Sequence, residues 1–158
     1  MITVIIPYKA GQPIYNPPIG DETLWIDEGL GIGEARIEGA RRARYDWLIM
    51  ADADGDYPAD YVDRVRKTII SGRYPLGFRT TRRGGFTRVG VESGIVVRKD
   101  VLLERTEGFV PDHRKDIMYI PHIFDDLPLV EDIRYVHGLT KDEKNQLLAA
   151  GVLFALVL

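Results

Sequence analysis

Short apolar runs alternate with amphipathic segments along most of the chain. The β-branched run from Thr3 to Ile6 stops at Pro7, which predicts a buried central strand. Shorter runs predict strands over 23–26, 46–51, 94–97 and 133–136. Periodic segments predict helices over 34–44, 58–70 and 100–105, and a C-terminal helix from about residue 141. This alternation predicts an open α/β sheet in a single domain spanning 1–158, with ligands bound beyond the carboxyl ends of its strands.

The segments around the first helix have distinctive compositions. Residues 11–20 (GQPIYNPPIG) contain three prolines and two glycines and predict a loop. The first helix carries a narrow face of small residues, which lets it lie close to a sheet: Ala35, Gly39, Ala40 and Ala43. Its basic residues predict a solvated face without a binding role: Arg36, Arg41, Arg42 and Arg44. In the second helix, Pro58 occupies a first-turn position.

Composition and charge narrow the classes of partner and cellular location that we expect. The net charge of −3 over 158 residues argues against nucleic acid as the main partner. The absence of cysteine excludes disulfides and thiolate metal sites and suits a reducing compartment, and the N-terminus lacks signal-peptide features, so we expect a cytoplasmic protein. The C-terminal LLAAGVLFALVL has twelve apolar residues, whereas a membrane span needs about 20. We expect a packed helix there, or a peripheral contact with the membrane surface.

Four aspartates follow the apolar run 47–50 within nine residues: Asp52, Asp54, Asp56 and Asp60. One hypothesis is that Asp56 or Asp60 caps the next helix. An EF-hand loop is disfavoured, because it requires Gly where Tyr57 stands and Glu where Asp63 stands. The third hypothesis is a site for Mg²⁺ or Mn²⁺ that binds a diphosphate, since such ions take one or two carboxylates plus phosphate oxygens. In an extended segment Asp52 and Asp54 point to one side and Ala53 into the fold.

The segment GLGIGEARIEGARRARYDWLIMADADGDYPADYV (29–62) resembles the central part of GT-A glycosyltransferases, and more narrowly of the polyprenyl-phosphate sugar synthases. The likeness continues in GFRT (77–80), ESGIVVRKDVLLE (92–104) and DIRYVHGLTK (132–141). It implies a Rossmann-like GT-A sheet with flanking helices. It also implies inverting transfer of a hexose from a GDP- or UDP-sugar to a polyprenyl or dolichyl phosphate.

The resemblance assigns roles to individual residues. It implies that Asp52, Asp54 and Asp56 bind the metal, with Asp52 also facing the donor and Asp54 acting in catalysis. The donor-binding residues implied are Pro7, Tyr8 and Arg79, to which we add Asp27 as a candidate of this chain, and the residues implied for the acceptor phosphate are Arg88, Arg134 and Lys141. A phosphate acceptor is already a nucleophile and needs cations rather than a strong base, a role that arginine suits well.

The chain departs from the family pattern after the first strand. About two dozen residues separate Pro7 from Gly31, where the family has a helix, a second strand ending in acidic residues and another helix. Either Asp27 and Glu28 replace those carboxylates or the base-reading subsite is absent. Two other functions stay open: transfer to a saccharide or protein hydroxyl with Asp116 as base, and a catalytically silent domain that binds a nucleotide sugar or a partner protein. Arg82 and Arg83 belong to a soluble loop or a mobile acceptor loop.

Overall fold

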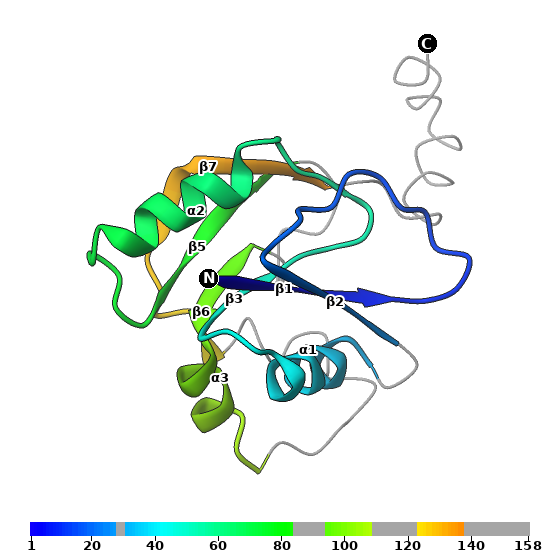
Figure 1. The fold of residues 1–158 in the computed structure, drawn as a ribbon, viewed down its shortest axis with the longest axis horizontal. Helices are drawn as coiled ribbons and strands as arrows, with labels where there is room; N and C mark the ends of the chain where they lie inside the picture. Colours follow the sequence, from blue (N-terminus) through cyan, green and yellow to red (C-terminus); the bar gives the residue numbers. More distant parts are fainter. Residues whose placement is uncertain (28–30, 84–93, 109–122, 138–158) are drawn as a thin grey trace.

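A computed structural model describes residues 1–27, 31–83, 94–108 and 123–137 (Figure 1). Seven strands and three helices lie within these ranges. The strands are β1 (Ile2–Tyr8), β2 (Glu22–Asp27), β3 (Trp47–Met50), β4 (Gly55–Asp56), β5 (Gly77–Arg83), β6 (Ile95–Arg98) and β7 (Leu129–His137). The helices are α1 (Ile32–Arg42), α2 (Tyr61–Ile70) and α3 (Lys99–Arg105).

All seven strands form one mixed sheet in the order β2-β1-β3-β6-β5-β7-β4. The strands β2, β1 and β3 are parallel neighbours. Strand β6 runs antiparallel between β3 and β5, and β5 pairs in parallel with β7. The predicted α/β class is therefore confirmed, as a mixed rather than a parallel sheet. The short strand β4 pairs antiparallel with β7 at the end of the sheet.

Helices cover both faces of the sheet. On one face, α1 and α3 pack over a core that includes Ile5, Leu48 and Val97 (Figure 1). On the other face, α2 packs over a second core built around Ile49 and Phe78. The small-residue face of α1 lies against β1, as predicted. A Cβ added at Gly39 would come within 2.5 Å of the Ile5 Cγ2 atom, so only glycine permits this close approach.

The sequence pattern missed or misplaced several elements. No strand was predicted over β5, and Arg82 and Arg83 were expected in a loop, because in GFRTTRR the only large apolar side chain is that of Phe78. Its neighbours β6 and β7 nevertheless bury the Phe78 and Thr80 side chains. Helix α2 begins at Tyr61 rather than at Pro58, whose carbonyl accepts a hydrogen bond from the Tyr61 amide. The predicted C-terminal helix lies outside the described residues.

Candidate functional site

Three parallel strands end at the same edge of the sheet and bring predicted site residues together. Tyr8 ends β1 and lies opposite Asp27, which ends β2. On the other side of β1, β3 ends at Met50 and leads into Asp52. Pro7 is buried in β1, and Tyr8 is half-buried. The Tyr8 ring packs edge-on against Trp25, with centroids 5.6 Å apart.

The buried side chain of Arg36 reaches this edge from α1. Its Nη1 atom donates to the carbonyl oxygens of Ile5 at 3.0 Å and Ala51 at 2.8 Å. Its Nη2 atom donates to Asp52 Oδ1 at 3.1 Å and completes an ion pair. The Arg36 side chain is 1% exposed and that of Asp52 is 22% exposed. One guanidinium therefore joins the middle of β1 to the residue after β3 and holds the first acidic side chain in place.

The prediction that Arg36 lies on a solvated helix face is wrong. Arg41, Arg42 and Arg44 are exposed as predicted. Arg36, however, is three, four and seven residues before Gly39, Ala40 and Ala43, and this spacing places it on the buried face. Helical periodicity alone identifies it as a residue that must find partners inside the fold. A charged residue at such a position requires hydrogen-bond acceptors, which the strand ends supply.

The acidic segment turns instead of staying extended. The Gly55 amide donates to the Asp52 carbonyl at 3.3 Å, and Asp54 lies half-buried inside this turn. Ala53 is buried in the second core, as predicted. The turn separates the aspartates, so Asp52 and Asp54 are not presented as successive residues on one side of a strand. We refer to residues 52–56 as the acidic turn.

Neither predicted capping role is found. Asp60 occupies the N-cap position of α2 without a capping hydrogen bond, and its Oδ2 atom instead accepts from Arg64 Nε at 2.7 Å. Asp56 belongs to β4 and accepts from Asn16 Nδ2 at 3.3 Å. The capping hypothesis for these two aspartates is wrong. Their partners are an arginine one helical turn further on and an asparagine from the N-terminal loop.

A cluster of buried tyrosines (Tyr57, Tyr61 and Tyr135) packs next to the acidic turn. The Tyr57 hydroxyl accepts a hydrogen bond from the Asp52 amide at 3.0 Å, and its ring stacks on Tyr135 at 4.5 Å. The Tyr61 hydroxyl is hydrogen-bonded to Thr80 Oγ1 at 2.8 Å. Burial raises the pKa of the Tyr57 phenol well above its ordinary value, with further contributions from Tyr135 and Asp52. Burial likewise raises the pKa of the Tyr61 phenol, so the Tyr57 and Tyr61 phenols stay neutral at physiological pH and do not exchange protons with the turn.

The proline-rich loop is tied to the acidic turn, a role that no sequence signal indicated. We call residues 15–21 the strap. The Tyr15 amide donates to Ala53 O at 3.0 Å, and the Asn16 amide donates to Gly55 O at 3.1 Å. In return, the Tyr57 amide donates to Asn16 O, and Asn16 Nδ2 donates to Tyr57 O, both at 3.0 Å. Both sides of the acidic turn are thus held by main-chain bonds.

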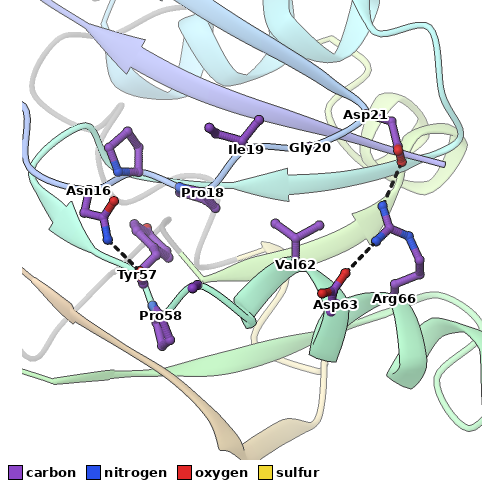
Figure 2. A pocket seen from close by; sticks show the side chains of 12 residues that line it. Asn16, Pro18, Ile19, Gly20, Asp21, Tyr57, Pro58, Val62, Asp63 and Arg66 are labelled. Atoms are coloured by element: carbon purple, nitrogen blue, oxygen red, sulfur yellow. Dashed lines mark hydrogen bonds and ion pairs between the residues drawn. The ribbon is translucent and has the colours of Figure 1, made fainter.

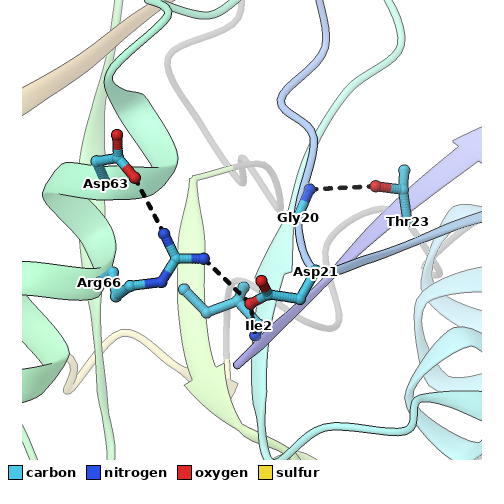
Figure 3. Close-up of polar contacts among 6 residues, drawn as sticks. All are labelled: Ile2, Gly20, Asp21, Thr23, Asp63 and Arg66. Atoms are coloured by element: carbon cyan, nitrogen blue, oxygen red, sulfur yellow. Dashed lines mark hydrogen bonds and ion pairs between the residues drawn. The ribbon is translucent and has the colours of Figure 1, made fainter.

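The other end of the strap is clamped to α2 (Figure 3). Asp21 Oδ2 accepts from the Ile2 amide at 2.7 Å and from Arg66 Nη2 at 3.1 Å, while Arg66 Nη1 donates to Asp63. The Ile2 amide, followed by Arg66, holds the pKa of the Asp21 carboxyl below its ordinary value. Between its two ends the strap forms one wall of a groove of about 320 Å³, and α2 forms the other (Figure 2).

A second cavity lies where β4 pairs with β7. It has a volume of about 310 Å³ and is lined by Asp56, Pro58, Arg83, Arg134, Tyr135 and Val136. It brings Arg134, predicted to contact the acceptor phosphate, next to the last residue of the acidic turn. Arg83 joins it from the end of β5, in a strand rather than in the predicted loop.

The remaining predicted site residues divide into two groups. Arg79 lies in β5, and its Nε atom donates to the Leu127 carbonyl at 2.8 Å. Leu127 precedes β7, so this contact directs the Arg79 side chain toward the segment before β7. Strand β6 lies between β5 and β3, so Arg79 is two strands away from the acidic turn's strand. Arg88, Asp116 and Lys141 lie outside the described residues.

The described residues contain no group of three His, Asp or Glu side chains placed to hold a metal ion. Asp52 forms an ion pair with Arg36, and Asp56 accepts a hydrogen bond from Asn16. A metal role for Asp54 and Asp56 would need phosphate oxygens as further ligands, as Mg²⁺ sites permit. A metal site here therefore requires the substrate to complete it.

No protein-family model matches the sequence, and no curated protein matches it at a significant level. Within the ranges that the structure describes, no helix is long and apolar enough to cross a membrane.

Proposed function

We propose that this chain is a GT-A-type glycosyltransferase domain that moves a hexose from a nucleotide diphosphosugar to a polyprenyl phosphate, with inversion at the anomeric carbon. One observation carries the proposal. The acidic turn emerges at the carboxyl edge of three adjacent parallel strands, where the ends of β1 and β2 also present Tyr8 and Asp27. Open α/β sheets bind their ligands at this edge.

Arg36 supports the proposal by fixing the site before any ligand arrives. It holds Ile5 O, Ala51 O and the Asp52 carboxylate together, so the acidic turn starts from a set position. Preorganised charge is the main means by which enzymes stabilise developing charge. In this proposal Asp52 orients the turn through Arg36, and Asp54 is the carboxylate that contacts the donor's metal.

The reaction divides between an acidic and a basic region. An oxygen of the acceptor phosphate forms a bond to the anomeric carbon, while the bond from that carbon to the donor diphosphate breaks and its electrons leave with the nucleoside diphosphate. A bound Mg²⁺ or Mn²⁺ supplies charge stabilisation for that leaving group. The proposal places the acceptor phosphate near Arg134, which shares a cavity with Asp56 and so lies beside the acidic turn.

A thermal-shift screen of GDP- and UDP-sugars with and without Mn²⁺ tests donor binding, because a ligand of the folded state raises its melting temperature. We expect at least one sugar nucleotide to raise the melting temperature only when Mn²⁺ is present. The hit then enters a transfer assay with radiolabelled sugar and polyprenyl phosphate. Label in the organic phase supports the proposed acceptor.

Two other outcomes identify the alternatives. Labelled aqueous saccharide indicates transfer to a hydroxyl, for which Asp116 is the predicted base. Donor binding without transfer to any acceptor indicates a silent nucleotide-sugar-binding domain. If no sugar nucleotide binds with or without Mn²⁺, the glycosyltransferase proposal is wrong.

A further inference from the structure

The two ends of the sheet differ in how they are covered. At one end, β4 is bordered by the strap, through the Asn16–Asp56 bridge and the bond from the Asn16 amide to Gly55 O. At the other end lies β2, whose residues 22–26 pair with β1 and with no other backbone in the ranges that the structure describes. An edge strand of this kind presents its outward N–H and C=O groups to an incoming strand.

Strand β2 lacks the features with which proteins protect such an edge. Its sequence ETLWID contains no proline, lysine or glycine, and it pairs with β1 residue for residue without a bulge. Trp25, in the middle of the strand, keeps 44% of its surface exposed, while its ring packs edge-on against Tyr8. A half-exposed aromatic side chain on an open edge strand favours pairing with a further strand, because cross-strand aromatic pairs stabilise sheets.

The sequence of β2 can pair with its own copy around a two-fold axis. Only alternate residues of an edge strand turn their backbone groups outward, so in an antiparallel pair of identical strands the axis must pass through a residue. With the axis at Trp25, the two Trp25 side chains meet and Thr23 lies opposite Asp27, so residues 23–27 pair without like charges. An axis at Leu24 instead brings Asp21 opposite Asp27, and like charges directly opposite each other destabilise a sheet.

Helix α1 limits what can pack beside this edge. It covers both β1 and β2, because a Cβ added at Gly39 would meet Ile5 and Ile26 (Figure 1). Strands are spaced about 4.8 Å apart, so α1 lies about half a spacing inside β2 and the two-fold axis half a spacing outside it. Two copies joined through β2 therefore place their α1 helices about 10 Å apart, which is the distance at which helices pack. The helix pair adds contact area to a pair of six-residue strands, as a stable dimer requires.

We propose that this chain forms a two-fold dimer by antiparallel pairing of β2 with β2 of a second copy, with Trp25 on the axis. The pairing joins two sheets into one and satisfies the outward backbone groups of both edges. It buries the two Trp25 side chains against each other on one face, and the two α1 helices pack together on the other. The dimer is independent of the proposed glycosyl transfer and needs neither donor nor metal.

Sedimentation velocity of the full chain tests the dimer. The parent is expected to sediment as a dimer that dissociates on dilution. Trp25→Asp places two like charges on the axis and should weaken dimerisation at least tenfold, whereas Ile70→Asp, at an apolar residue of α2 that is 77% exposed, should stay within twofold. A mixture of Trp25→Asp with Trp25→Lys should restore the dimer, because opposite charges then meet. Circular dichroism verifies that each variant is folded.

The absence of cysteine from the chain makes the register directly testable. In Trp25→Cys the two thiols face each other across the axis, with Cα atoms about 4.5–5.5 Å apart, which a disulfide can bridge. Mild oxidation is expected to link two Trp25→Cys chains covalently. Ile70→Cys, which carries its thiol away from β2, should form few such links under the same conditions.

Three results overturn the proposal: a parent that sediments as a monomer at every concentration, a dimer that persists in Trp25→Asp, and crosslinking of Trp25→Cys no faster than that of Ile70→Cys. Hydrogen exchange then identifies what covers β2 in a monomer. Protection of the outward amides of residues 22–27 at every dilution shows that another segment of the same chain covers the edge. Rapid exchange of these amides shows that the edge is open to an extended segment of a different protein.

Discussion

Replacement of Arg36 by Met tests whether this one side chain holds the strand ends and the acidic turn together. Methionine has nearly the same helix propensity and a similar length, so α1 itself is expected to persist. The variant loses three hydrogen bonds from a buried cation, to Ile5 O, Ala51 O and Asp52 Oδ1. It also no longer buries a guanidinium that is 1% exposed.

The expected cost follows from these opposing terms. Hydrogen bonds that involve a charged group contribute about 1.5–3 kcal/mol each, so three give about 4.5–9 kcal/mol. Removal of the buried charge also removes its desolvation penalty of several kcal/mol, which offsets part of this loss. Ile5 O still accepts from the Ala51 amide, and Asp52, at 22% exposed, can bind water. We expect a net loss of about 2–4 kcal/mol, or about 6–12 °C in melting temperature for a chain of this size.

Urea unfolding followed by circular dichroism measures the loss, with Arg41→Met as control. Arg41 lies on the same helix with 63% of its side chain exposed, in a 3.6 Å ion pair with Glu38. Its replacement should change the unfolding free energy by no more than about 0.5 kcal/mol. Asp52→Asn should fall between the two variants, since the amide oxygen still accepts from Arg36. Equal losses in the two Met variants would refute the role assigned to Arg36.

Three further predictions concern the strap and α1. Asp21→Asn should lower stability near pH 7 but not near pH 2. The folded-state pKa of Asp21 is depressed, so the stability it contributes is present above the unfolded-state pKa and is lost as the pH falls through the folded-state pKa. Melting curves across pH check this, and a difference in stability that persists at pH 2 contradicts it. Asn16→Ala removes two side-chain hydrogen bonds, so it should lower the free energy of unfolding in urea by about 1–2 kcal/mol and weaken any Mn²⁺-dependent donor binding. Unchanged stability would mean that the strap does not stabilise the acidic turn. Gly39→Ala should destabilise by about 1–3 kcal/mol despite its better helix propensity, because its Cβ meets Ile5; a more stable variant would place α1 further from β1.

The apolar pattern predicted most of the framework because burial leaves a direct trace in the sequence. Strands β1 and β3 are short apolar runs, and the small-residue face of α1 marks its close approach to the sheet. The acidic cluster was predicted at the end of β3 and is found there, as a turn instead of the expected extended segment. These features depend on which side chains are buried, and burial produces a periodic pattern of apolar residues in the local sequence.

Features that depend on distant partners left little or no local trace. Strand β5 is polar and becomes a strand only because β6 and β7 flank it. Nothing in the strap indicates that Asn16 bonds to Tyr57, 41 residues away. Arg36 is different: its helical spacing did point inward, and its charge alone suggested a solvated face. A charged residue on a buried face should be read as one that needs internal partners.

The central claim is that the acidic turn seats a divalent ion together with a donor diphosphate. Calorimetry of the sugar nucleotide identified by thermal shift, titrated in Mn²⁺ into the parent chain, Asp54→Asn and Asp46→Asn, tests it most directly. Asp46 is exposed at the opposite end of β3 and carries the same substitution away from the site. The account predicts Mn²⁺-dependent binding that Asp46→Asn retains and Asp54→Asn loses, with both variants folded. Binding that survives in Asp54→Asn, or that needs no divalent ion, would contradict it.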